Sequence, residues 1–328
     1  MKTIVGGIEQ IGYGAELLRN GEVVAFPTET VYGLGADAFN ARAVAKIFEA
    51  KGRPQDNPLI VHIADPADIG KVAASVPETA VALMEVFSPG PLTLILPKRE
   101  DLPETTTGGL RTVGIRIPNH PIARALIRAA GCPVAAPSAN VSGRISPTEA
   151  RHVLEDMDGR IPLILDGGCS DIGIESTVLD LSKEVPVVLR PGAITAEMLS
   201  VYLGKVVDFK GKVLIAEAPG MKYRHYAPTC ACQAARSPEV AAREARRRME
   251  EGARVVIIGS TPFVRACGDL PVIDLGNTPA DCMRNVFSAM RNAEKTADLL
   301  LLEDFSDRRE FYSLQNRLSK STGGVVLS

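Results

Sequence analysis

The feature that most constrains this chain is a repeated alternation between short β-rich runs and amphipathic helical patterns, which begins at Gly21. Runs 91–96 and 112–117 follow one another without a helical pattern between them, so we expect an antiparallel pair within a mixed, twisted sheet. The strand candidates are 21–26, 58–63, 91–96, 112–117, 133–138, 162–167, 176–181 and 185–190, and the helix candidates are 40–52, 120–131 and 147–159. In the helix candidate 40–52, Asn40 is a suitable N-cap and Gly52 is a suitable residue to end the helix. The pattern predicts an α/β fold.

The alternation of strand and helix patterns stops near Gly204. Residues 205–232 contain Gly, Pro, Lys and Tyr without a helical period, which indicates a linker with some strand character. Beyond it, helical patterns (237–252, 279–297, 308–322) alternate with β-rich runs (253–260, 270–276, 297–305, 323–328). We therefore expect a first domain over 1–204, a linker over 205–232, and a smaller parallel, Rossmann-like α/β domain over 233–328. The run 253–260 lacks G-x-G-x-x-G, so a dinucleotide site is not expected there.

Composition narrows the class of protein. Apolar residues make up 45% of the chain and charged residues 23%, as in ordinary globular proteins. The net charge of −2 argues against broad, non-specific binding of nucleic acid. The six cysteines are scattered, as reduced thiols are, and the C-x-C pair Cys230 and Cys232 is a weak metal signal. The sequence has no apolar run long enough to span a bilayer, and its start does not resemble a secretory signal, so we expect a cytoplasmic protein.

The stretch "PTETVYGLG" (27–35) follows the apolar run 23–26 and is interpreted as a binding loop. Its threonine hydroxyls and backbone amides are the groups expected to face a ligand, and its glycines predict a turn that lets backbone approach that ligand closely. The loop holds no lysine, no histidine and no phosphate-loop spacing, so these residues leave the identity of the ligand open.

Cations cluster near strand and helix ends. Lys51 and Arg53 stand between Gly52 and Pro54 and precede Asn57, an arrangement open to two interpretations, compensation of a helix dipole or an anion site. Alternation along a strand places Thr112, Gly114 and Arg116 on one side. An arginine there is costly to bury unless a carboxylate from the protein or a ligand pairs with it.

Further polar residues lie within or next to other strand candidates. His62 interrupts an apolar strand, where an isolated histidine is more often a satisfied core residue than a ligand. Residues Ser138, Asn140 and Ser146 suit either a binding loop or an ordinary turn that caps the next helix, and Ser176 and Arg190 border two later strands. Together with Lys51, Arg53 and Arg116 they predict a cleft for a polyphosphate and a carboxylate. Neither a P-loop nor G-x-S-x-G occurs, so we expect a reaction that depends on positioning and charge stabilisation.

At this point a family resemblance is visible. The motifs "PTETVYGLG", "KGRPQDNPLIVHI", "GIRIP", "PSANVSG", "IESTV" and "LRPGAI" stand in the order found in the threonylcarbamoyl-AMP synthase family. The tail, joined through "KYRHYAP", is similar to the extra domain of the longer two-domain members. The resemblance implies an enzyme, a nucleotidyltransferase that converts L-threonine, bicarbonate and ATP into L-threonylcarbamoyl-adenylate and pyrophosphate for tRNA modification.

Roles of single residues follow from the same resemblance. It implies that threonine is bound by Thr30, His62, Arg116 and Ser176, with Arg116 on the carboxylate. It implies an ATP site formed by Lys51, Arg53, Asn57, Thr112, Ser138, Asn140, Ser146, Arg190 and Tyr226, with Lys51 and Arg53 catalytic. Mg²⁺ would accompany the triphosphate, and no metal ligands are predicted in the chain. Segment 218–228 is hypothesised to act as a lid that carries Tyr226.

Two other functions fit parts of the sequence. A concave basic sheet could grip RNA without turnover, but the acidic balance and the lack of tryptophan make this the weaker interpretation. The related carbamoyl-adenylate chemistry of hydrogenase maturation proteins requires zinc-binding cysteine pairs and an acylphosphatase part, which this sequence lacks. The role of the C-terminal domain is left open among regulation, lid control and docking to the tRNA threonylcarbamoyl transferase complex, as are direct tRNA contact and oligomeric state.

Overall fold

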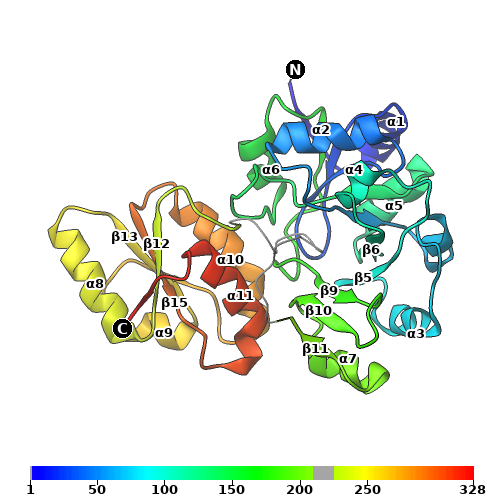
Figure 1. The fold of residues 1–328 in the computed structure, drawn as a ribbon. Helices are drawn as coiled ribbons and strands as arrows, with labels where there is room; N and C mark the ends of the chain where they lie inside the picture. Colours follow the sequence, from blue (N-terminus) through cyan, green and yellow to red (C-terminus); the bar gives the residue numbers. More distant parts are fainter. Residues whose placement is uncertain (1, 210–224) are drawn as a thin grey trace. The chain divides into compact units, whose positions relative to one another are not determined.

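The computed structural model describes residues 2–209 and 225–328, which form two compact units (Figure 1). The second unit contains residues 225–328 together with Gly143–Ser146 and Ile172–Ile174, and the first contains the rest of the described chain. Each unit has its own sheet. No helix among the described residues combines the length and the apolar character that crossing a bilayer requires.

The first unit is built on a mixed sheet of eleven strands. These are β1 (Ile4–Gly6), β2 (Val24–Phe26), β3 (Gly33–Asp37), β4 (Ile60–His62), β5 (Leu92–Pro97), β6 (Thr112–Arg116), β7 (Val134–Ala136), β8 (Leu163–Leu165), β9 (Thr177–Asp180), β10 (Val187–Arg190) and β11 (Val207–Asp208). Their order is β1-β8-β2-β3-β7-β4-β6-β5-β9-β10-β11. The pair β5–β6 is antiparallel and the pair β4–β6 is parallel, which confirms the mixed sheet.

Helices of the first unit lie around this sheet (Figure 1). They are α1 (Ile11–Arg19), α2 (Ala41–Lys51), α3 (Glu78–Phe87), α4 (Glu104–Thr107), α5 (Pro121–Ala130), α6 (Ala150–Met157) and α7 (Ala196–Leu203), with 3₁₀ turns η1 (Ile8–Gln10) and η2 (Pro66–Lys71). Helix α2 has the expected ends. The Asn40 side chain accepts hydrogen bonds from the amides of Arg42 and Ala43, both at 3.1 Å, and Gly52 closes the helix at φ +60°.

The two faces of the central strands differ in chemistry. One face contributes Val61, Leu94, Ile115 and Leu179 to the large core of the unit. Because side chains alternate along a strand, His62 and Arg116 point to the opposite face, as does Thr93 of β5. The central strands therefore carry polar side chains on the face that looks away from the large core.

Two smaller apolar clusters also lie on that second face. One joins Phe26 and Val24 of β2 to Leu126 of α5 and Leu18 of α1. The other consists of three side chains, Ile95, Val178 and Leu189, from β5, β9 and β10. Strands β4 and β6 lie between these clusters in the sheet order, so their polar residues form a polar stretch between the two clusters.

The expected glycine turn is wrong, because Gly33 and Gly35 belong to strand β3, which pairs antiparallel with β2. Neither glycine has a positive φ. Their role is steric, since a Cβ on Gly35 would lie 2.6 Å from Cγ1 of Val134 and 2.7 Å from Cε1 of Phe26. The connection between the strands is Pro27–Tyr32. Strand β1 was also not anticipated, because its three residues are too few to show a period.

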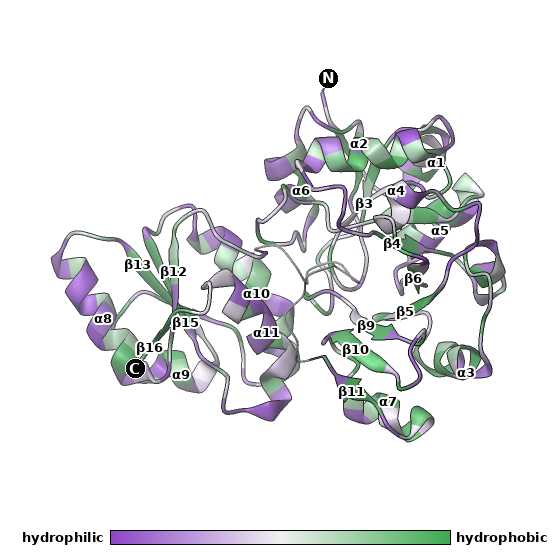
Figure 2. Ribbon diagram, in the orientation of Figure 1, coloured by the Kyte–Doolittle hydropathy of each residue, from purple (hydrophilic) through white to green (hydrophobic). Residues whose placement is uncertain are grey.

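The second unit is a small parallel α/β structure, as predicted. Its strands are β12 (Ala231–Ala235), β13 (Val255–Gly259), β14 (Val272–Asp274), β15 (Leu299–Glu303) and β16 (Val326–Leu327), in the order β14-β13-β15-β12-β16 with every pair parallel. Its helices are α8 (Pro238–Glu250), α9 (Thr261–Ala266), α10 (Pro279–Ala293) and α11 (Tyr312–Ser321), with the 3₁₀ turn η3 (Arg309–Phe311). Helix α8 is strongly hydrophilic (Figure 2), as a solvated charged face requires. Of the segment hypothesised to be a lid, residues 218–224 lie outside the described residues.

The packing at Gly35 predicts the result of adding one methyl group. We expect Gly35→Ala to lower the free energy of unfolding by about 1–3 kcal/mol, because the new Cβ overpacks the Phe26 ring and Val134. Gly12→Ala is the matched control. Gly12 lies in α1, and apart from its chain neighbours and the backbone of its own helix no atom lies within 4 Å of its Cβ position, so alanine there should stabilise by roughly 0.5–1 kcal/mol. Urea unfolding monitored by circular dichroism measures both, and equal effects would contradict the packing argument.

Candidate functional site

The polar stretch centres on Arg116, at the end of β6. Its guanidinium is buried and is held by three groups. Nη1 donates to Oγ1 of Thr30 at 2.9 Å, and Nε donates to the carbonyl of Gly90 at 3.2 Å. Nη2 lies 2.7 Å from Oε1 of Glu29, an ion pair whose angles are not those of a hydrogen bond. The carboxylate that the sequence required is thus supplied by the protein itself.

The loop Pro27–Tyr32 is organised from within by the hydroxyl of Thr28. This hydroxyl accepts from the amides of Thr30 and Val31, both at 3.2 Å, and donates to the carbonyl of Val31 at 2.6 Å. The amide of Tyr32 donates to the carbonyl of Pro147. The expectation that backbone amides of this loop face a ligand is therefore wrong for these three residues. What the loop directs toward Arg116 is the hydroxyl of Thr30 and the carboxylate of Glu29.

His62 is held neutral beside Arg116. The two residues are register partners on the parallel strands β4 and β6. Burial, followed by the positive charge of Arg116, lowers the pKa of His62 to about 3. Its ring meets the Phe26 ring edge-on with centroids 5.9 Å apart, while Nδ1 is buried without a hydrogen-bond partner. A satisfied core histidine would have both nitrogens paired, so the orphaned Nδ1 favours contact with a ligand.

Ser176, just before β9, belongs to the same sheet face. Its hydroxyl lies 2.8 Å from Oγ1 of Thr93 on β5. Arg190, at the end of β10, donates from Nε to the carbonyl of Ser176 and from Nη2 to its hydroxyl, both at 3.0 Å. The structure therefore brings Ser176 and Arg190 into direct contact, and neighbouring strands connect them to Arg116.

Lys51 anchors the segment that holds Ser138 and Asn140. Its buried ammonium donates to the backbone carbonyls of both residues, and its own carbonyl accepts from the amide of Ser142 at 2.9 Å. The Ser138 hydroxyl donates to Oδ1 of Asn140 at 2.5 Å. These contacts with a distant segment favour the site interpretation of Lys51 over simple compensation of a helix dipole.

Three further predicted residues lie in the first unit. Nη2 of Arg53 donates to the carbonyl of Pro58 at 3.2 Å and, more weakly, to that of Asn57 at 3.4 Å. Oδ1 of Asn57 is buried without a hydrogen-bond partner. Thr112 is partly exposed at the start of β6, on the same side of that strand as Arg116.

The remaining two predicted residues lie in the second unit. Ser146 is buried there, and it does not cap the next helix, whose N-cap is Glu149. Tyr226 has φ +60° and stacks on Phe287 of α10 with centroids 5.3 Å apart, and the guanidinium of Arg317 lies 5.8 Å from its ring.

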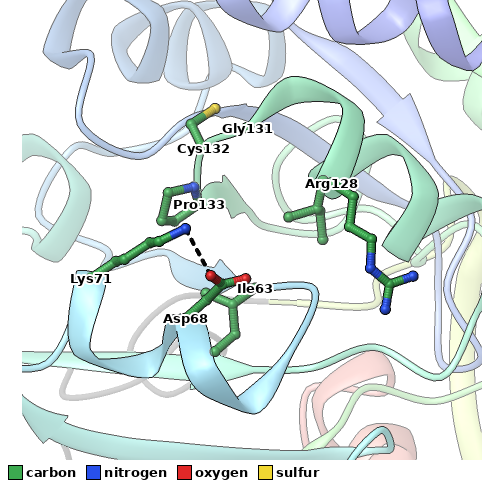
Figure 3. Close-up of a pocket in the computed structure, with 8 residues that line it drawn as sticks. Ile63, Asp68, Lys71, Arg128, Gly131, Cys132 and Pro133 are labelled. Atoms are coloured by element: carbon green, nitrogen blue, oxygen red, sulfur yellow. Dashed lines mark ion pairs between the residues drawn. The ribbon is translucent and has the colours of Figure 1, made fainter.

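A separate cavity of about 220 Å³ lies between η2 and the end of α5 (Figure 3). Its wall includes the ion pair of Lys71 with Asp68, at 2.7 Å, and Cys132, whose pKa burial raises to about 12. It contains none of the residues predicted for the site. The candidate site is therefore defined by the polar contacts around Arg116 and Lys51.

Sequence reasoning missed Glu29 and Thr93, and it assigned to a ligand the hydroxyl of Thr28, which instead forms hydrogen bonds within the loop. Glu29 stands in the quoted loop, and the requirement that a buried Arg116 be paired could have identified it. Thr93 carries no comparable signal, because threonines are common in strands.

Two family models and several known proteins match the chain. The family model described as "Telomere recombination" matches residues 16–192, and the model described as "Threonylcarbamoyl-AMP synthase, C-terminal domain" matches residues 194–323. The chain is 46% identical to a threonylcarbamoyl-AMP synthase of Bacillus subtilis, over 97% of this chain and 94% of the relative. It is 45% identical to one of Pyrococcus abyssi, over 97% and 95%. The crystal structure of P. abyssi Sua5 complexed with L-threonine is similar, with a TM-score of 0.93, 43% identity and 99% coverage of both chains.

The pKa of His62 predicts a pH dependence of stability. The folded value of about 3 lies below the ordinary 6.5, so between these values the unfolded chain binds a proton that the folded chain excludes. The contribution of neutral His62 to the free energy of unfolding is fully present above about pH 6.5. It falls by about 1.4 kcal/mol per pH unit as the pH decreases below that value. We expect His62→Gln to remove this slope in urea unfolding between about pH 6 and 4. Parallel curves for variant and parent would contradict a buried neutral His62.

Proposed function

The chain belongs to the threonylcarbamoyl-AMP synthase family, in its two-domain form, and from that premise we propose that the polar stretch around Arg116 is the amino-acid subsite of its reaction. The enzyme is a nucleotidyltransferase that makes L-threonylcarbamoyl-adenylate from L-threonine, bicarbonate and ATP and releases pyrophosphate. The product serves the formation of N6-threonylcarbamoyladenosine in tRNA.

The observation that carries the assignment of the subsite is the buried guanidinium of Arg116. A guanidinium presents several N–H donors in a fixed plane, which suits a carboxylate. Thr30 and His62 lie next to Arg116, and the orphaned Nδ1 of His62 is an acceptor for an N–H or O–H of the substrate. Ser176 supplies a further hydroxyl on the same face. The similar P. abyssi protein complexed with L-threonine supports an amino acid as the occupant.

The nucleotide subsite is proposed to lie around Lys51 and the Ser138–Asn140 segment. In support, a buried ammonium is anchored there beside two side chains that can hydrogen-bond a phosphate or ribose. Within the first unit the proposed set is Lys51, Arg53, Asn57, Thr112, Ser138, Asn140 and Arg190. Lys51 and Arg53 would offset the negative charge that builds on the phosphate oxygens.

The proposed chemistry has two steps. The amine of threonine, once its ammonium form has lost a proton, attacks the carbon of bicarbonate, and loss of water leaves a carbamate. A carbamate oxygen then attacks the α-phosphorus of ATP, the bond to the β-phosphate oxygen breaks, and pyrophosphate leaves with its electron pair. The protein has no covalent task in this sequence, so its contribution is to hold three substrates in line and to stabilise charge.

Mg²⁺ is proposed to arrive with ATP. Among residues 2–209 and 225–328, no group of three or more His, Cys, Asp or Glu side chains is arranged to hold a metal ion. A cation carried on phosphate oxygens needs no such group, because Mg²⁺ often keeps several waters and binds through the substrate. Its chemistry would be neutralisation of the negative charge on the phosphate oxygens.

Partners and compartment follow from the reaction. A reactive adenylate intended for tRNA must reach a second enzyme, so we propose hand-over to a tRNA threonylcarbamoyl transferase complex in the cytoplasm. The net charge of −2 favours this over direct capture of tRNA by the whole surface.

Substrate selectivity provides the direct test of function. We expect pyrophosphate release and a threonylcarbamoyl-adenylate mass when the protein is given ATP, Mg²⁺, bicarbonate and L-threonine. L-serine should react roughly 10- to 200-fold more slowly, because it lacks one methyl group. Coupled pyrophosphate detection and mass spectrometry measure both. Equal turnover with threonine, serine and alanine would overturn the assignment of the amino acid.

Two lysines of helix α2 allow a matched test of the nucleotide subsite. Lys51→Met keeps the apolar stem and removes the buried ammonium. We therefore expect the rate of pyrophosphate release to fall about 100- to 1000-fold. Lys46→Met removes an ammonium from the same helix, where it pairs with Glu22 at the surface, and should leave turnover within about twofold. If both variants turned over equally, Lys51 would have no special role.

A further inference from the structure

Glu29 is the one charged partner of Arg116 among its described contacts, and both side chains are only 5% exposed. Its second oxygen, Oε2, accepts from the amide of Asn119 at 2.9 Å. The carboxylate is therefore fixed at both oxygens and cannot swing freely into solvent. Apolar residues often stabilise a protein as well as a buried ion pair does, so stability alone does not explain this pair. The pair therefore points to a role at the site.

The pair sets the charge at the amino-acid subsite. Arg116 contributes one positive charge and Glu29 one negative charge, while the low pKa of His62 keeps that ring neutral. The next cation, Arg190, contacts Ser176 and is assigned above to ATP, whose phosphates would neutralise it. With ATP in place, the charges of Arg116 and Glu29 thus balance one another before the amino acid enters.

We propose that Glu29 makes the amino-acid subsite selective for a zwitterion, because its carboxylate offsets the ammonium of the ligand while Arg116 binds the ligand's carboxylate. A ligand with both charges leaves the buried site balanced. A hydroxy acid that lacks the amine brings an uncompensated negative charge next to Glu29, and an amino alcohol brings an uncompensated positive charge. The inference rests on the proposed role of Arg116 and makes Glu29 a specificity-determining residue that the family motifs alone did not identify.

The test compares ligands that differ by one charge. Dissociation constants of L-threonine, 3-hydroxybutanoate and threoninol are measured by ligand-observed NMR with the full-length protein. We expect the unaltered protein to bind threonine roughly 10- to 100-fold more tightly than 3-hydroxybutanoate. In Glu29→Gln this ratio should fall by about tenfold or more, because the lone Arg116 then favours the anion. An unchanged ratio in Glu29→Gln overturns the inference.

Controls separate charge from structure. Glu22→Gln makes the same substitution at a surface ion pair with Lys46 and should leave the ratio unchanged. Glu29→Asp keeps the charge, so it should retain the ratio even where both affinities fall. If Glu29→Gln does not fold, the unaltered protein still decides, because equal binding of threonine and 3-hydroxybutanoate to it contradicts the inference.

The same measurements distinguish this inference from the proposed function. Arg116→Met should abolish binding of threonine, and if it does not, Arg116 is not the carboxylate site and the proposed subsite is wrong. If Arg116→Met abolishes binding while Glu29→Gln leaves the ratio intact, only the inference about Glu29 fails.

Discussion

The burial of a guanidinium on the face of a β-sheet is the constraint on which the rest of the first unit depends. Arg116 lies at the end of an otherwise apolar strand, where an unpaired charge would cost several kcal/mol. Glu29, the hydroxyl of Thr30 and the carbonyl of Gly90 satisfy it. Two of these three partners stand in the connection between β2 and β3, so the path of that loop and the position of the arginine are set together.

The strands use their two faces for different purposes. The face with Val61 and Ile115 supplies the main core, while His62 and Arg116 occupy the opposite face. Since side chains alternate with a period of two, a slip of one residue in register would exchange core and site. Stability of the core thus fixes the register that orients the polar residues, and this is how a site can be precise without any motif for a nucleophile.

The second unit shows that contacts do not follow chain order. The backbone of Gly143–Ser146 packs with residues from the far end of the chain, since the carbonyl of Ile145 accepts from Nε of Arg291 at 3.2 Å and that of Gly143 accepts from the amide of Ala227 at 2.9 Å. Arg144 pairs with Glu294 at 2.7 Å. A buried arginine and an ion pair hold the segment that carries Ser146, which is why a turn interpretation from local sequence was incomplete.

The sequence by itself determined the α/β class, the antiparallel pair of 91–96 with 112–117, the ends of helix 40–52 and the family, because periodicity, capping and ordered motifs are local properties of the chain. It also required a carboxylate for Arg116 without naming one. Only the tertiary structure decided that this partner is Glu29, that Gly33 and Gly35 form a strand, and that His62 is neutral with an orphaned nitrogen. These depend on burial and on contacts between segments distant in sequence, which no local pattern encodes.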